Sequence, residues 1–125
     1  MEDLMLVGPE PEYAGELASY RKEMLEASSS MDGCGRLRAT DDMEKYLEDC
    51  RLGESWETVE PGKVPANQYL CIRKSDGKLL GMLQIRHCLN DYLEKFAGHI
   101  GYSVRPSERR KGYAKWMLSQ ALPIC

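Results

Sequence analysis

Basic residues gather directly before a glycine in the last quarter of the sequence. Arg109, Arg110 and Lys111 precede Gly112, and an apolar stripe typical of a helix follows from Ala114. The first turn of a helix has backbone N–H groups without intrahelical partners, and the helix dipole is positive there. Such a helix start binds phosphates, and a glycine lets a bulky phosphate reach the backbone. The segment therefore predicts a phosphate site, and a solvent-exposed basic turn is the alternative.

The class of phosphate ligand is narrowed by what the sequence lacks. Neither the P-loop motif G-x-x-x-x-G-K-[S/T] nor the dinucleotide motif G-x-G-x-x-G occurs. Nucleic acid is a further alternative, since basic residues stand among aromatic ones: Arg105, Arg109, Arg110, Lys111 and Lys115 with Tyr113 and Trp116. The net charge of −3, with 16 acidic and 6 basic residues in positions 1–60, argues against that partner.

The elements that position this segment follow from hydrophobic periodicity and turn residues. We expect strands at 3–7, 67–73, 79–88 and 98–104, helices at 10–27, from 40 to Gly53 and from Gly112 to Pro123, and a short helical turn at 90–97. Asp76-Gly77 predicts a hairpin, and Thr40 or Asp41 is expected to cap the second helix. Adjacent antiparallel strands with segregated helices predict an α+β layered fold in one domain.

The buried faces of the predicted helices can be assigned from residue spacing. They comprise Tyr13, Leu17, Tyr20, Met24 and Ala27 in the first helix, Met43, Leu47 and Cys50 in the second, and Ala114, Met117, Leu118, Ala121 and Leu122 in the last. Gly81 is expected to mark a bulge or a close approach of chains. Residues 28–35 and 54–66 are expected to be loops.

Composition and cysteine usage indicate the cellular setting. The 125 residues are 42% hydrophobic and 30% charged, as in a globular protein. The longest apolar run is far shorter than a membrane span, and the N-terminus does not resemble a signal peptide. Five scattered cysteines without C-x-x-C predict neither a disulfide framework nor a metal site. We therefore expect a cytoplasmic protein with no metal.

The basic segment resembles the acetyl-CoA motif of the GNAT superfamily of N-acetyltransferases. That motif is Gln or Arg, two residues, Gly, one residue, then Gly or Ala, and Arg109, Gly112 and Ala114 fill its three places. The preceding Gly-His-Ile-Gly-Tyr-Ser-Val is similar to the family's fourth strand, and the upstream order of elements also matches. The resemblance implies the GNAT fold, a mostly antiparallel mixed sheet flanked by helices.

The resemblance also implies a reaction and a set of ligand contacts. Acetyl-CoA would be the co-substrate, and the acceptor would be a primary amine of a small molecule or peptide. By the family's layout, residues 28–39 and 54–66 would flank the acceptor pocket. Backbone N–H groups from Arg110 to Ala114, including those of Lys111, Gly112 and Tyr113, would cradle the pyrophosphate, with Arg109 beside them. Ser103 and Val104 would pair with the pantetheine arm through their main chain. A strand N–H would polarise the thioester carbonyl.

The sequence departs from the family in its last part. It ends just after the motif helix, so residues 1–125 are expected to form a single acetyltransferase domain that is incomplete at its C-terminal end. An open fourth strand would favour self-association, giving a homodimer. The general acid and base are not assigned, and His99 is the leading base candidate, ahead of Glu94 and Tyr92. A non-catalytic CoA-binding module or an enzyme fragment is the alternative function.

Overall fold

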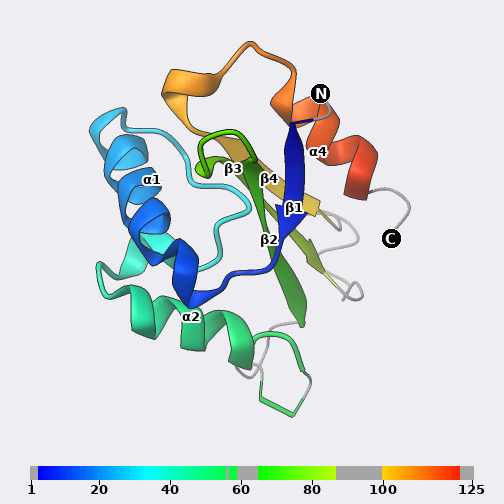
Figure 1. The fold of residues 1–125 in the computed structure, drawn as a ribbon. Helices are drawn as coiled ribbons and strands as arrows, with labels where there is room; N and C mark the ends of the chain where they lie inside the picture. The colour runs from blue at the N-terminus through cyan, green and yellow to red at the C-terminus, as the bar shows by residue number, and fades with distance from the viewer. Residues whose placement is uncertain (1–2, 56, 59–64, 87–99, 122–125) are drawn as a thin grey trace.

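Four strands form one antiparallel sheet, which is the floor of the candidate site. In the computed structural model, described over residues 3–55, 57–58, 65–86 and 100–121, the strand order is β1-β2-β3-β4 (Figure 1). The strands are β1 (Leu4–Val7), β2 (Ala66–Arg73), β3 (Lys78–Arg86) and β4 (Ile100–Val104). Each strand pairs with the next one in the chain. The predicted strands and their antiparallel pairing are thus confirmed in the described residues.

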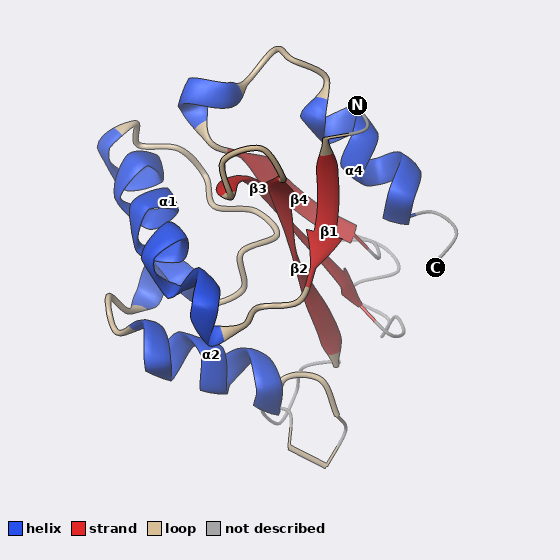
Figure 2. Ribbon diagram, in the orientation of Figure 1, coloured by secondary structure: helices blue, strands red, loops and turns tan. Residues whose placement is uncertain are grey.

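Helices lie against both faces of the sheet (Figure 2). One face packs against α1 (Ala14–Glu26) and α2 (Met43–Leu52), and the other against α4 (Tyr113–Ala121). Alternation along the strands divides the core accordingly: Leu70, Ile72 and Met82 face α1 and α2, while Cys71, Leu83 and Val104 face α4. The expected layered α+β fold is confirmed.

Helix α1 buries the stripe that its spacing predicts. Leu17, Tyr20 and Met24 are fully buried, whereas Ala27 follows the helix and is exposed. The first turn of the predicted helix is instead a separate 3₁₀ turn at Pro11–Tyr13, in which the Tyr13 N–H donates to the Glu10 carbonyl oxygen at 2.9 Å.

The cap of α2 lies one residue beyond the predicted positions. Asp42 has extended backbone angles, and its carboxylate accepts hydrogen bonds from the N–H groups of Glu44 and Lys45. Thr40 instead accepts a hydrogen bond from the Asp42 N–H, at 3.1 Å. The prediction that Thr40 or Asp41 caps α2 is therefore wrong. Thr40, Asp41 and Asp42 are all residue types that cap helices, and only the backbone conformation decides which one does.

The β2–β3 hairpin turns at Asp76-Gly77 as predicted, and Gly81 is a point of close approach. A Cβ at Gly81 would lie 2.8 Å from the Ser103 carbonyl oxygen and 2.8 Å from the Met117 methyl group. Other predictions concern positions outside the described residues: the strand ends at 87–88 and 98–99, the turn at 90–97, and the helix end at Leu122 and Pro123.

Candidate functional site

The basic segment after β4 forms a short 3₁₀ turn and then an open loop that leads into α4. The turn is η3 (Pro106–Glu108). Arg110 and Gly112 then take positive φ angles of 65° and 83°. The Trp116 N–H donates to the Gly112 carbonyl oxygen at 3.0 Å, so Gly112 stands at the N-terminus of α4, as predicted.

The N–H groups of this loop have no acceptor among the described residues. Within the described part of the chain, no N–H from Arg110 to Lys115 donates to a backbone or side-chain oxygen. Arg110 and Gly112 have left-handed φ angles and Lys111 between them does not, and such an alternation is the backbone pattern of an anion-binding nest. The loop and the first turn of α4 therefore fit a phosphate group.

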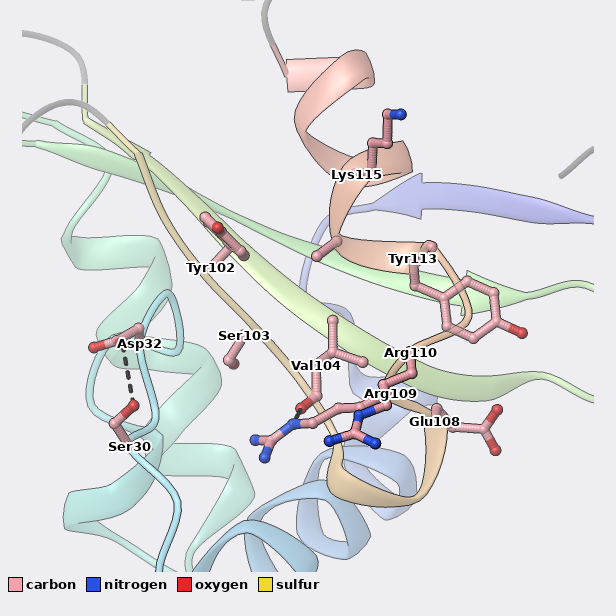
Figure 3. Close-up of a pocket in the computed structure, with 12 residues that line it drawn as sticks. Ser30, Asp32, Tyr102, Ser103, Val104, Glu108, Arg109, Arg110, Tyr113 and Lys115 are labelled. Atoms are coloured by element: carbon pink, nitrogen blue, oxygen red, sulfur yellow. Dashed lines mark hydrogen bonds between the residues drawn. The ribbon is translucent and has the colours of Figure 1, made fainter.

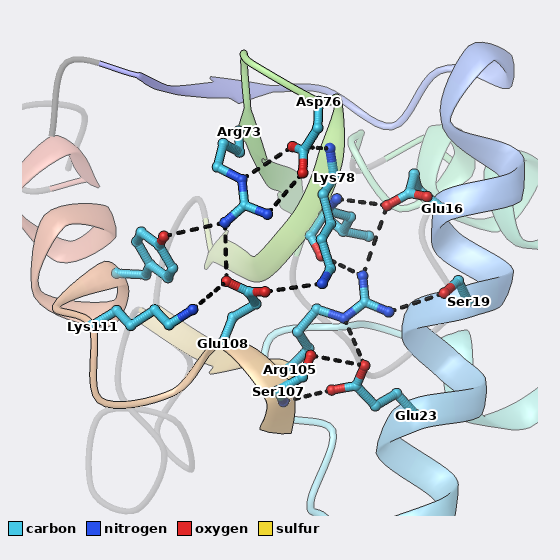
Figure 4. A network of polar contacts seen from close by, with 12 residues as sticks. Glu16, Ser19, Glu23, Arg73, Asp76, Lys78, Arg105, Ser107, Glu108 and Lys111 are labelled. Carbon is cyan, nitrogen blue, oxygen red and sulfur yellow. Dashed lines mark hydrogen bonds and ion pairs between the residues drawn. The ribbon is translucent and has the colours of Figure 1, made fainter.

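On the α1 side, Arg105 fixes the start of the loop. Its side chain is buried, and its guanidinium donates to Glu23, to the Leu79 carbonyl oxygen and to the Ser19 hydroxyl at 2.9–3.0 Å (Figure 4). Glu23 also accepts from the N–H of Ser107 at 2.7 Å. These contacts lower the pKa of Glu23 despite its partial burial. The loop is thereby bound to the middle of α1.

On the hairpin side, Glu108 fixes the loop through three cations. Its buried carboxylate lies 3.0 Å from Arg73, 2.9 Å from Lys78 and 3.1 Å from Lys111 (Figure 4). Asp76 holds the far side of the Arg73 guanidinium at 2.8 Å. Hydrogen bonds from Lys78, Lys111 and Arg73 lower the pKa of Glu108 to about 2, against the effect of desolvation. Glu108 therefore stays ionised and connects the loop to the hairpin.

A pocket of about 470 Å³ opens along the side of β4 that has no paired neighbour among the described strands, between this loop and residues 30–32 (Figure 3). Its volume is within the range of small-molecule sites. Its lining consists of Ser30, Asp32, Tyr102, Ser103, Val104, Glu108, Arg109, Arg110, Gly112, Tyr113, Ala114 and Lys115. The structure thus brings together all but one of the residues predicted to contact the ligand.

The predicted ligand-contacting cations take up different positions. Lys111 lies outside the lining, with its ammonium group on Glu108. Arg109 folds back, donating to the Val104 carbonyl oxygen at 2.9 Å and to Ser29 at 2.6 Å, so it shapes the loop. Arg110 makes no hydrogen bond or ion pair with another described residue, so its charge is available to an anion.

The opposite wall of the pocket comes from residues 28–39, which the family resemblance placed beside the acceptor, although Ser30 and Asp32 were not predicted individually. Ser30 donates to Asp32 at 3.1 Å, and Gly33 presses the same loop onto β4. The Ser103 hydroxyl oxygen lies 2.8 Å from the hydroxyl oxygen of Tyr20. The sequence had assigned Tyr20 only to the core. Helical spacing correctly buries Tyr20, but no local signal shows which strand residue its hydroxyl meets.

Some candidates cannot be placed. His99, Glu94 and Tyr92 lie outside the described residues, and no catalytic base is assigned. Within the described ranges, no group of three or more His, Cys, Asp or Glu side chains is placed to hold a metal ion. No helix in the same ranges is long and apolar enough to cross a membrane.

Comparison with known proteins agrees with this fold. Residues 32–125 match the family model described as Acetyltransferase (GNAT) family. Among solved structures, a proposed ribosomal-protein-serine acetyltransferase from Vibrio cholerae is similar, with a TM-score of 0.61 and 20% sequence identity. The match covers 98% of this chain and 62% of that one, so the chain spans less than two thirds of its structural relative. No curated protein sequence matches.

The layered fold and the family match define an acyltransferase domain. Because the family model covers more than half of the chain, the protein belongs to the GNAT family of acetyltransferases. The family membership and the fold class expected from the sequence are both confirmed.

Proposed function

We propose that the protein is an N-acetyltransferase that transfers the acetyl group of acetyl-CoA to a primary amine of a small molecule or peptide. The observation that carries this proposal is the row of N–H groups from Arg110 to Lys115, none of which donates to a described residue, beside the pocket along β4. A pyrophosphate in that cradle leaves the pantetheine arm to run along Ser103 and Val104, as the family resemblance implies.

The proposed reaction requires no covalent bond between the protein and either reactant. The amine nitrogen attacks the thioester carbonyl carbon, a C–N bond forms and the C–S bond breaks. The amine gives up its proton, and the CoA sulfur leaves as a thiolate that takes up a proton. The residues of the pocket hold the two reactants in line, and donors near the carbonyl stabilise its developing negative charge.

The acceptor enters, in this proposal, beside residues 30–32. Asp32 lines that end of the pocket, and its carboxylate favours a cationic amine over a neutral or anionic one. The Vibrio cholerae relative is described as a ribosomal-protein-serine acetyltransferase. A panel of amines tested as acceptors should therefore include peptides with an N-terminal serine. A cytoplasmic location remains a prediction from the sequence.

A CoA-binding module or a fragment of such an enzyme is the second candidate. The observation that favours it is that the structural match covers only 62% of the Vibrio cholerae protein. Turnover of acetyl-CoA with the amine panel separates the two candidates, because the module binds the ligand without releasing CoA thiol.

Calorimetric titration with acetyl-CoA tests the phosphate cradle. Gly112→Glu puts a side chain and a negative charge where the pyrophosphate is expected, and we expect binding to be lost. Gly77→Glu is the matched control, because Gly77 has φ +70°, open space around it and a position in the hairpin turn away from the pocket. Equal loss of binding in both variants, or none in Gly112→Glu, would reject the cradle.

A further inference from the structure

The Ser103 hydroxyl connects the pocket to two buried side chains. It lies 2.8 Å from the Tyr20 hydroxyl and 3.4 Å from the Cys34 sulfur. Tyr20 and Cys34 are fully buried, whereas Ser103 is half-buried and lines the pocket. The position of the hydroxyl protons decides what Ser103 offers to a ligand.

In the hydrogen bond between these two hydroxyl groups, we take Tyr20 to be the donor and Ser103 the acceptor. Burial raises the pKa of Tyr20, so the phenol keeps its proton. In the described part of the chain its only hydrogen-bond partner is Ser103, and a buried donor without an acceptor is costly. The phenol therefore points its proton at the Ser103 oxygen, which leaves the proton of Ser103 unused by this pair.

Cys34 does not compete strongly for that proton. Burial raises the pKa of the Cys34 thiol to about 12, so it too stays protonated. Its S–H has the Asp32 carbonyl oxygen as an acceptor at 3.6 Å, and sulfur itself accepts only weakly. A carbonyl oxygen arriving in the pocket would be a better acceptor for Ser103 than the thiol.

The position of Ser103 in the pocket indicates which carbonyl group of a bound ligand it could reach. Arg110 and Lys115 lie on the side of the pocket formed by the loop and α4, which is its phosphate end in the proposed function, while Ser103 contacts Cys34 in the loop that carries Asp32 (Figure 3). The thiol arm of acyl-CoA runs from its phosphates to its thioester. Ser103 thus stands toward the end where the thioester and the acceptor amine meet.

We propose that the Ser103 hydroxyl donates a hydrogen bond to the thioester carbonyl of acyl-CoA, with Tyr20 as the positioning residue that orients it. This inference rests on the proposed function and adds a side-chain donor to it. Ser103 keeps its proton throughout: the hydrogen bond strengthens as the carbonyl oxygen gains negative charge and weakens again when the C–S bond breaks.

The test compares two ligands that differ at the carbonyl. Acetyl-CoA has it, and S-ethyl-CoA has a methylene group in its place. We expect Ser103→Ala to weaken acetyl-CoA binding about tenfold, the size of one hydrogen bond, and to leave S-ethyl-CoA binding within about twofold. Ser103→Thr retains the hydroxyl and should retain the wild-type ratio of the two affinities.

Tyr20→Phe keeps the packing of the ring and removes the donor to Ser103. It should reduce the preference for acetyl-CoA in part and lower kcat more than it raises KM. Equal weakening of both ligands by Ser103→Ala, or no weakening of either, would overturn the inference. If the wild-type protein binds neither ligand, the proposed function itself fails.

Discussion

Glu108 shows how a single residue can hold the ligand loop in place. Its carboxylate meets cations from β2, from β3 and from its own loop, and it is 5% exposed. Replacement by glutamine keeps the shape and removes the charge. The loop would then lose its electrostatic tie to the hairpin while Arg105 still holds its other end.

We expect Glu108→Gln to lower the free energy of unfolding by about 1.5–3 kcal/mol, the usual range for hydrogen bonds to a charged group. Urea denaturation measures this change, and calorimetry should show weaker binding of acetyl-CoA. Glu48→Gln is the control, because Glu48 pairs with Arg51 on the exposed surface of α2 and should matter little. Similar effects of the two variants would contradict the role given to Glu108.

The contribution of Glu108 to the free energy of unfolding should depend on pH. The folded pKa of Glu108 is about 2, below its ordinary value of 4.5. A carboxyl group with a lowered pKa stabilises the fold fully above its unfolded pKa, and that stabilisation is lost as pH falls toward the folded pKa. The stability difference between wild type and Glu108→Gln should therefore be constant above about pH 5 and shrink between about pH 5 and pH 2. A difference that grows on acidification would contradict this.

At the scale of elements, the loop before α2 is fitted to β4 by one glycine. Gly33 has φ +72°, and a Cβ there would lie 2.5 Å from the Gly101 carbonyl oxygen and 2.6 Å from the Tyr102 Cα. Neither backbone atom can move without shifting the strand. The wall of the pocket that carries Asp32 therefore depends on the absence of a side chain at position 33.

We expect Gly33→Ala to destabilise the protein by about 1–3 kcal/mol more than Gly35→Ala. Gly35 is the matched control, since it also has a positive φ of 60° but its Cβ would meet only side-chain atoms at 3.5 Å. Thermal or urea unfolding measures both variants. Equal destabilisation would show that backbone strain alone, and not the contact with β4, accounts for the effect.

Elements governed by local sequence could be predicted, and contacts between distant segments could not. Asp76-Gly77 fixes a turn within a few residues, and the spacing of Leu17, Tyr20 and Met24 fixes a buried face. The motif likewise located the loop at Gly112. By contrast, Glu108 looked like one acid in a basic run, because its partners in β2 and β3 lie 30 or more positions away.

At the scale of the whole molecule, β4 has one paired neighbour among the described strands. The outer side of β4 is also the wall of the pocket, and Tyr102 on that strand is 41% exposed. Unpaired strand edges tend to pair with another chain. The ligand and a second copy of the protein would therefore compete for the same backbone groups.

We predict that the protein self-associates through β4 and that acetyl-CoA reverses the association. Sedimentation velocity over a range of protein concentrations should show a reversible monomer–dimer equilibrium in the absence of ligand. Acetyl-CoA should shift it toward monomer in proportion to the occupied sites, because each bound ligand stabilises only the form with an open edge. Gly112→Glu should associate like the wild type but not respond to the ligand. A monomer at every concentration would rule out the dimer, and association that ignores acetyl-CoA would place the contact on another surface.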